Sequence, residues 1–227
     1  SMRFSFILLA GGNSLRFESS LPKPYHKIGG KTLIELSINK IKKFNEFRRT
    51  IIVCNKKHIP LLKKINLPNV KIINGGKSRQ DSTLNALNYL QKNNIKDHIL
   101  IHDAARPNFS ENLICKILKE SKKNNAVIPI LKLQDALKER LTKNNFSNKN
   151  RQNFFVTQTP QSFKFKKIFE AHRKYKNKYL DDDLSLLDDD DEIKLIKGEK
   201  KNFKITDKLD FELLKNIYKS NLKIGIG

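Results

Sequence analysis

The stretch FILLAGGNSLRF, from Phe6 to Phe17, decides the fold class. Its apolar start is typical of a buried strand, and Gly11 and Gly12 follow directly. Glycines let backbone amides approach a phosphate closely, and Arg16 adds a permanent positive charge. The stretch matches neither G-x-G-x-x-G nor a Walker A motif. Alone, it fits a phosphate cradle and a tight turn between a strand and a helix equally well.

Similar apolar runs return along the chain, and helical patterns alternate with them. Strand-like runs cover 51–53, 70–73, 99–101 and 126–130, and helical patterns cover 33–41, 59–65, 84–90, 113–118 and 164–175, with a last helix capped at Thr206-Asp207 and running to Tyr218. This alternation predicts an α/β fold with a Rossmann-like, mostly parallel sheet flanked by helices. Ligands of such sheets bind beyond the carboxyl ends of the strands, so the loops there are the candidate site.

A segment at about 132–156 breaks the alternation. A polar run at 143–148 separates two pieces with strand-like alternation, which predicts a β-hairpin arm that protrudes from the body; a disordered surface loop is the alternative. Residues 2–220, with the arm included, are expected to form one domain, and 221–227 to be a linker or the start of a following domain.

Composition limits the classes of partner. The chain has 46 Lys and Arg against 23 Asp and Glu, a net charge of +23. Lysine is spread evenly and mixed with asparagine, and no nucleic-acid-binding motif accompanies it, so we expect no nucleic-acid partner. No stretch approaches the roughly 20 apolar residues of a membrane span, which predicts a cytoplasmic protein without a membrane partner. Cys54 and Cys115 lack metal-ligand spacing and are expected to be buried free thiols.

Two further loops carry phosphate-binding chemistry. Lys23 lies between two prolines, and a lysine on a stiff segment suits a fixed charge for a triphosphate; an ordinary surface lysine is the alternative. The segment 75–82, GGKSRQDS, precedes a helix, so Gly76 and Ser82 could hold a nucleobase edge or an anion. A plain glycine turn with a serine cap competes with that interpretation.

The segment HDAARP, residues 102–107, ends the fourth strand. Asp103 could hold a sugar hydroxyl or Mg²⁺, and Arg106 a phosphate, while an internal Asp103–Arg106 pair is the alternative. His102 is expected to be structural. Segments 157–163, 181–185 and 202–207 are individually weak signals, and the acidic run after Asp188 is interpreted as a solvated loop.

In this order and at these spacings, the segments resemble the 2-C-methyl-D-erythritol 4-phosphate cytidylyltransferase family over nearly all of the chain. HDAARP is the most diagnostic single segment. The resemblance implies transfer of CMP from CTP to 2-C-methyl-D-erythritol 4-phosphate, with Mg²⁺, in non-mevalonate isoprenoid biosynthesis. It also implies a homodimer that exchanges contacts through the arm.

The resemblance further implies roles for individual residues. Arg16 and Lys23 would hold the triphosphate and stabilise the transition state, and Lys204 would assist near the reacting phosphate. The residues expected to line the CTP pocket are Ala10, Gly11, Gly12, Gly76 and Ser82. The acceptor would be bound by Asp103, Arg106 and, from the arm of the partner subunit, Arg151, with Asp103 also the candidate Mg²⁺ ligand if the CTP phosphates do not hold the ion alone.

Several positions depart from the family pattern: Ser14 replaces a glycine, Pro24 a glutamine, Lys77 an often acidic residue, and Ala136 and Asp181 replace threonines. The last two remove hydroxyls expected near the acceptor. They keep open a cytidylyltransferase for another polyol phosphate, such as ribitol 5-phosphate.

The end of the chain, NLKIGIG at 221–227, resembles the opening strand of 2-C-methyl-D-erythritol 2,4-cyclodiphosphate synthase. We therefore expect the transferase half of a bifunctional protein. A phosphosugar-binding module without turnover is the alternative of another class, and the cations Arg16, Lys23 and Lys204 disfavour it.

Overall fold

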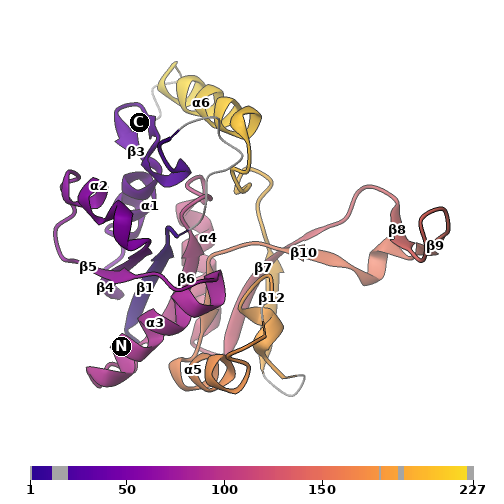
Figure 1. Ribbon diagram of the computed structural model, residues 1–227, viewed down its shortest axis with the longest axis horizontal. Helices are drawn as coiled ribbons and strands as arrows, with labels where there is room; N and C mark the ends of the chain where they lie inside the picture. The colour runs from indigo at the N-terminus through magenta and orange to yellow at the C-terminus, as the bar shows by residue number, and fades with distance from the viewer. Residues whose placement is uncertain (1, 12–19, 179, 189–191, 224–227) are drawn as a thin grey trace.

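A computed structural model describes residues 2–11, 20–178, 180–188 and 192–223. Figure 1 shows a body of helices packed around a central sheet, from which a long two-stranded arm projects. The predicted α/β architecture is therefore confirmed, and so is the arm, whose tip is an ordered hairpin and not a disordered loop.

Within the described residues, eight strands form the main sheet, in the order β10-β7-β11-β6-β1-β4-β5 with β12 beside β7. The strands are β1 (Phe4–Leu9), β4 (Phe47–Cys54), β5 (Val70–Asn74), β6 (His98–Asp103), β7 (Ala126–Lys132), β10 (Phe155–Thr157), β11 (Gln161–Phe163) and β12 (Ile193–Lys197). β1 pairs in parallel with both β4 and β6, whereas β10 and β11 pair antiparallel with their neighbours. The sheet is thus mostly parallel.

Helices cover both faces of this sheet. They are α1 (Leu33–Ile41), α2 (Ile59–Lys63), α3 (Arg79–Lys92), α4 (Glu111–Ser121) and α5 (Phe165–Lys174), whereas α6 (Lys208–Lys223) lies outside this layer. Side chains alternate along β1, so Phe6 and Leu8 pack with α1, α2 and α4, while Ile7 and Leu9 pack with α3 and α5. The helix α6 packs on α1 through a separate small cluster that includes Phe211 and Leu214.

Local capping sets where the helices begin. Thr32 and Glu35 form a capping box at α1, and the Ser78 hydroxyl accepts from the Asp81 amide at 3.0 Å, so α3 starts five residues before the apolar pattern does. The predicted cap at Thr206-Asp207 is confirmed, because the Asp207 carboxylate accepts from the Asp210 amide at 2.9 Å.

The arm leaves the sheet after β7 and returns at β10. Its tip is formed by β8 (Leu137–Arg140) and β9 (Phe146–Lys149), paired antiparallel. A second small hairpin, β2 (Lys27–Ile28) with β3 (Lys31–Thr32), turns through Gly29 and Gly30 at positive φ, which glycine adopts without strain.

The two cysteines differ in burial, and the end of the chain continues the last helix. Cys54 is buried as predicted, but Cys115 is exposed, because it lies on the face of α4 that points away from the sheet. Residues 221–223 form the last turn of α6, and 224–227 lie outside the described residues, so the linker interpretation stays a prediction. No helix among the described residues is long and apolar enough to cross a bilayer.

Candidate active site

A cavity of about 370 Å³ opens at the carboxyl ends of β1, β4 and β5. Its lining residues are Gly11, Asn55, Lys56, Gly75, Gly76, Lys77, Ser78, Arg79 and Ser82. Three of the residues predicted to bind CTP therefore line this cavity: Gly11, Gly76 and Ser82. Ala10, directly before Gly11, is buried at the end of the same strand segment, and its amide donates to the Val53 carbonyl at 2.8 Å. Gly12 lies outside the described residues.

Gly76 is required by packing. A Cβ at this position would lie 2.4 Å from the Cβ of Asp81, in the first turn of α3. The Ser82 hydroxyl accepts from the Gly76 amide at 3.0 Å, so the loop is closed onto the helix that follows it. The cavity wall is therefore built by contact between this loop and the start of α3.

The loop after β6 forms the second part of the site. The Asp103 carboxylate lies 3.7 Å from the Arg106 Nε, so the internal pair is present. The other end of Arg106 donates from Nη1 to the Asn202 carbonyl at 3.0 Å, and the Ile205 amide donates to the Ala105 carbonyl at 2.8 Å. These bonds bring the 202–206 segment against the loop.

The two lysines predicted to act on phosphate approach the same place. Lys23 lies in a 3-10 helix, η1 (Lys23–Tyr25), after the extended Pro22, and its ammonium donates to the Ile205 carbonyl at 3.3 Å. Lys204 is exposed, and its charge acts on Asp103. The structure thus gathers Lys23, Asp103, Arg106 and Lys204. Arg16 and Ser14 lie outside the described residues, so their positions stay predictions.

Asp103 is ionised at neutral pH. Burial by itself would raise the pKa of its carboxyl group, but Arg79 and then Lys204 outweigh burial and hold the pKa below its ordinary value. Because Arg79 also lines the cavity, it connects the cavity wall with Asp103 at the end of β6.

His102 is structural, as the sequence suggested. Its Nε2–H donates to the Arg106 carbonyl at 2.7 Å, so Nδ1 accepts from the Thr159 hydroxyl at 2.8 Å. That hydroxyl in turn accepts from the Asp103 amide at 3.1 Å. Burial lowers the pKa of His102 to about 3, so the ring stays neutral and fixes the backbone at Asp103.

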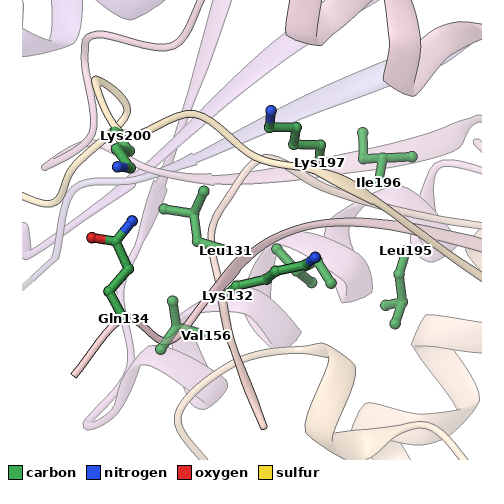
Figure 2. A pocket seen from close by; sticks show the side chains of 9 residues that line it. Leu131, Lys132, Gln134, Val156, Leu195, Ile196, Lys197 and Lys200 are labelled. Atoms are coloured by element: carbon green, nitrogen blue, oxygen red, sulfur yellow. The ribbon is translucent and has the colours of Figure 1, made fainter. Parts of the chain in front are cut away.

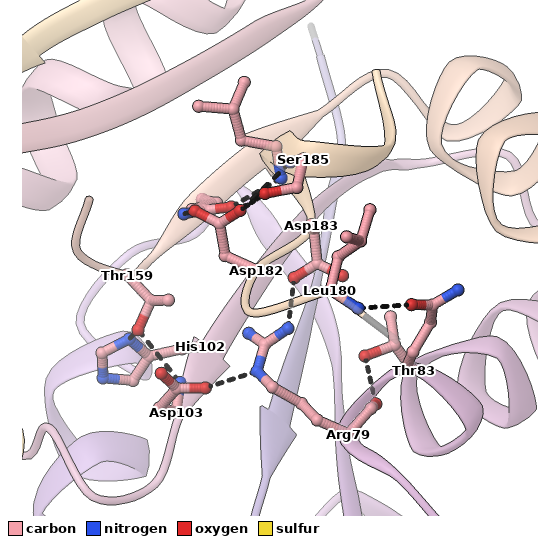
Figure 3. Close-up of polar contacts among 12 residues, drawn as sticks. Arg79, Thr83, His102, Asp103, Thr159, Leu180, Asp182, Asp183 and Ser185 are labelled. Carbon is pink, nitrogen blue, oxygen red and sulfur yellow. Dashed lines mark hydrogen bonds and ion pairs between the residues drawn. The ribbon is translucent and has the colours of Figure 1, made fainter. Parts of the chain in front are cut away.

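Sequence reasoning missed Arg79. Its Nε donates to Asp103 at 3.0 Å and its Nη1 to Asp183 at 2.9 Å (Figure 3). The signal was available, because a positive charge in the first turn of a helix opposes the helix dipole and needs a separate reason. Its partner lies in the weak acidic segment 181–185, where Arg79 and then His172 lower the pKa of Asp183 to about 2 against the effect of burial.

Within one chain, Arg151 lies apart from the cluster around Asp103. It begins η3 (Arg151–Asn153) at the root of the arm, and its Nη1 donates to the Gln134 carbonyl at 2.6 Å. This hydrogen bond is made within the arm, which points away from the body (Figure 1).

A second cavity, of about 860 Å³, lies beside the root of the arm (Figure 2). Its lining comes from β7, β10 and β12 and from the segments that follow β7 and β12, and it consists of Ile130, Leu131, Lys132, Gln134, Val156, Leu195, Ile196, Lys197 and Lys200. Val156 and Leu195 are 44% and 39% exposed, so part of its apolar wall faces solvent.

Comparisons with known proteins agree on one family. A model of the 2-C-methyl-D-erythritol 4-phosphate cytidylyltransferase family matches residues 4–220. The bifunctional enzyme IspD/IspF of Pelagibacter ubique (strain HTCC1062) is 43% identical over 226 residues, which cover 100% of this chain and 59% of the relative. The 2-C-methyl-D-erythritol 4-phosphate cytidylyltransferase of Thermosipho africanus (strain TCF52B) is 33% identical over 218 residues, which cover 92% of this chain and 95% of the relative.

Solved structures agree as well. The crystal structure of 4-diphosphocytidyl-2C-methyl-D-erythritol synthase from Anaerococcus prevotii superposes with a TM-score of 0.82 at 27% identity, covering 96% of this chain and 99% of that one. The structure of the bifunctional IspDF from Campylobacter jejuni superposes with a TM-score of 0.79 at 26% identity, covering 92% of this chain and 53% of that one.

The chain thus spans little more than half the length of the bifunctional relatives and nearly all of the single-function ones. With the fold, the ordered loops and the family match in agreement, the chain belongs to the 2-C-methyl-D-erythritol 4-phosphate cytidylyltransferase family of nucleotidyltransferases.

Proposed function

We propose that this chain transfers CMP from CTP to 2-C-methyl-D-erythritol 4-phosphate, giving 4-diphosphocytidyl-2-C-methyl-D-erythritol and pyrophosphate. One observation carries the proposal: Arg79 lines the glycine-walled cavity and also binds Asp103, so the cavity adjoins the Asp103–Arg106 pair, which suits two substrates bound side by side. Family membership supplies the identity of the two substrates.

The chemistry needs no nucleophile from the protein. A phosphate oxygen of the acceptor attacks the α-phosphorus of CTP, the bond to the β-phosphate oxygen breaks, and pyrophosphate leaves. Catalysis then consists of aligning two anions and stabilising the charge that gathers on the phosphoryl oxygens. We assign this role to Arg16, Lys23 and Lys204, of which Lys23 and Lys204 approach the Asp103 loop.

We divide the binding roles between the cavity and the loop after β6. Backbone and hydroxyl groups of Ala10, Gly11, Gly12, Gly76 and Ser82 would hold the cytidine part of CTP. The ionised Asp103 would accept a hydrogen bond from an acceptor hydroxyl, and Arg106 would bind on the other side of that hydroxyl.

Magnesium is proposed to enter as a complex with CTP. Asp103 is surrounded by the positive charges of Arg79, Arg106 and Lys204, which disfavour binding of Mg²⁺ at its carboxylate. Among the described residues, no group of three or more His, Cys, Asp or Glu side chains is arranged to hold a metal. We therefore give the triphosphate oxygens, and not Asp103, as the ligands of Mg²⁺.

We also propose a homodimer through the arm. Phe146 and Leu141, at the tip, are 63% and 60% exposed, and the cavity beside the arm root has an exposed apolar wall. Burial of these surfaces against a second copy would remove apolar area from water. Arg151 would then reach the acceptor phosphate bound to the partner subunit.

The cellular setting is inferred from chemistry. Free Cys54 and Cys115, without a disulfide, suit the reducing cytoplasm. The bifunctional relatives support a fused cyclodiphosphate synthase domain in the full-length protein.

The direct test is release of pyrophosphate from CTP and Mg²⁺, with either 2-C-methyl-D-erythritol 4-phosphate or ribitol 5-phosphate as acceptor. We expect turnover with the first acceptor and at least tenfold less with the second. A rate with both acceptors no higher than that of a Lys23→Ala control would refute the proposed transferase.

A further inference from the structure

Arg79 holds two carboxylates from distant parts of the chain. Its Nε lies 3.0 Å from Asp103 Oδ1 and its Nη1 lies 2.9 Å from Asp183 Oδ2, so one planar guanidinium joins the loop after β6 to the 181–185 segment. Figure 3 shows Arg79 between these two aspartates. The fork geometry of arginine suits this bridge, whereas a lysine ammonium offers a single point charge.

The position of Arg79 in its helix is explained by these partners. It is the first residue of α3, whose amide groups point their positive ends toward it. A cation there opposes the helix dipole, so the helix itself gains nothing from it. The two carboxylates provide the compensating negative charge, and they draw the start of α3, which is part of the CTP-side wall, toward Asp103.

Asp183 is buried and has a second partner besides Arg79. Its side chain is 1% exposed, and its second oxygen, Oδ1, lies 2.9 Å from the Nε2 of the buried His172 in α5. The neighbouring Asp182 accepts from the Thr157 hydroxyl at 2.5 Å and from the Gln161 amide at 3.0 Å. The anchor of Arg79 is therefore fixed to α5 and to the sheet.

Asp103 keeps one oxygen for other partners. Oδ1 is bound by Arg79, while Oδ2 lies 3.7 Å from the Arg106 Nε, beyond an ordinary hydrogen bond. The Arg106 Nε has no hydrogen-bond partner among the described residues. A hydroxyl placed between Oδ2 and Arg106 would satisfy both groups.

We propose that Arg79 and Asp183 form a clasp that positions the Asp103 carboxylate for the acceptor and fixes it to the helix that builds the CTP pocket. Arg79 is then a positioning residue, which acts on the acceptor through Asp103. This inference rests on the proposed function, because that function makes Asp103 an acceptor-binding group.

The test is a double-mutant cycle of Arg79→Gln and Asp103→Asn in the proposed reaction. Loss of Arg79 alone should raise the KM for the acceptor about tenfold and the KM for CTP less than threefold. In the Asp103→Asn background, loss of Arg79 should raise the acceptor KM less than twofold further, because residues that act as a unit are not additive. Additive effects of the two substitutions would overturn the clasp.

Two further variants test whether Arg79 acts through its carboxylate partners. Asp183→Asn touches neither Asp103 nor the CTP cavity, and it should raise the acceptor KM several-fold with an unchanged KM for CTP. Arg49→Gln is the matched control: Arg49 pairs with Asp97 at 3.6 Å, at the opposite end of β6, with exposures of 32% and 13% against 24% and 14% for Arg79 and Asp103. It should leave both KM values unchanged.

A crystal structure of the Arg79→Gln protein gives a readout without turnover. The Asp103 carboxylate should leave its present position or become disordered, and an unmoved carboxylate would overturn the proposal. If Arg79→Gln does not fold, Arg79→Lys replaces it in both experiments. A wild-type protein without turnover would refute the proposed function, whereas an active wild type with an additive cycle would refute the clasp alone.

Discussion

The ammonium group of Lys40 lies 2.6 Å from the backbone carbonyl oxygen of Pro107. It also donates to the Phe109 carbonyl at 2.9 Å and lies over the Phe109 ring. A lysine near the end of α1 thus supports the far side of the loop that carries Asp103 and Arg106. Burial lowers the pKa of Lys40 to about 8, although Glu199 and Glu111 act to raise it.

Replacement of Lys40 by Met should loosen this loop. Two buried carbonyls would lose their donor, which costs about 1–3 kcal/mol of unfolding free energy, and the KM for the acceptor should rise. Urea unfolding and pyrophosphate release measure the two effects. Lys43→Met is the control, because the Lys43–Glu111 pair is exposed and should contribute under about 1 kcal/mol. Equal effects of both substitutions would contradict a special role for Lys40.

Asp183 should make stability depend on pH in acid. Its pKa is lowered from an ordinary 3.8 to about 2, so the folded state favours the charged form. The resulting stabilisation, about 2 kcal/mol, is fully present above about pH 5 and is lost as the pH falls through 2.

Urea unfolding of the wild type and of Asp183→Asn should show this. Near neutral pH the variant should be less stable by about 3–5 kcal/mol, because Arg79 and His172 lose a buried partner. The gap should narrow by about 2 kcal/mol at pH 2. A gap that stays constant from pH 6 to pH 2 would refute the assignment.

Two glycine substitutions should act differently at the same cavity. Gly76→Ala forces its Cβ onto Asp81 and should lower stability, by about 1–3 kcal/mol. Among the described residues, the methyl group of Gly11→Ala meets the Ser82 hydroxyl at an ordinary 3.8 Å, so the variant should keep its stability while the methyl group obstructs CTP. Thermal unfolding with and without CTP distinguishes the two cases, and a stable Gly76→Ala protein would show that the loop can move away from α3.

Sharing of the site between subunits predicts complementation. Arg16→Ala and Arg151→Ala proteins should each be inactive, and mixed heterodimers should regain part of the activity, because one of their two sites has both arginines. The readout is pyrophosphate release after subunit exchange. Absence of recovery in heterodimers verified by two different tags would rule out a shared site.

Much of the fold was predictable from sequence because it depends on local periodicity. The apolar run Phe6–Leu9 specifies a strand that is buried on both faces, and the helical spacing of 33–41 specifies a helix and the face that it buries. The break in the pattern at 132–156 likewise indicated the arm. The exposure of Cys115 was missed, because a helical pattern alone does not say which flank of the helix the neighbouring elements cover.

The sequence by itself determined the helices and central strands of the α/β body and, through the ordered motifs, the candidate chemistry of Asp103, Arg106 and Lys204. Only the tertiary structure decided that Arg79 binds both Asp103 and Asp183, and that Lys40 supports Pro107. The physical reason is the sequence separation of the residues that interact. Periodicity acts over a few residues, whereas the Arg79–Asp183 contact spans 104 positions and forms only after strand order and helix packing bring the two segments together.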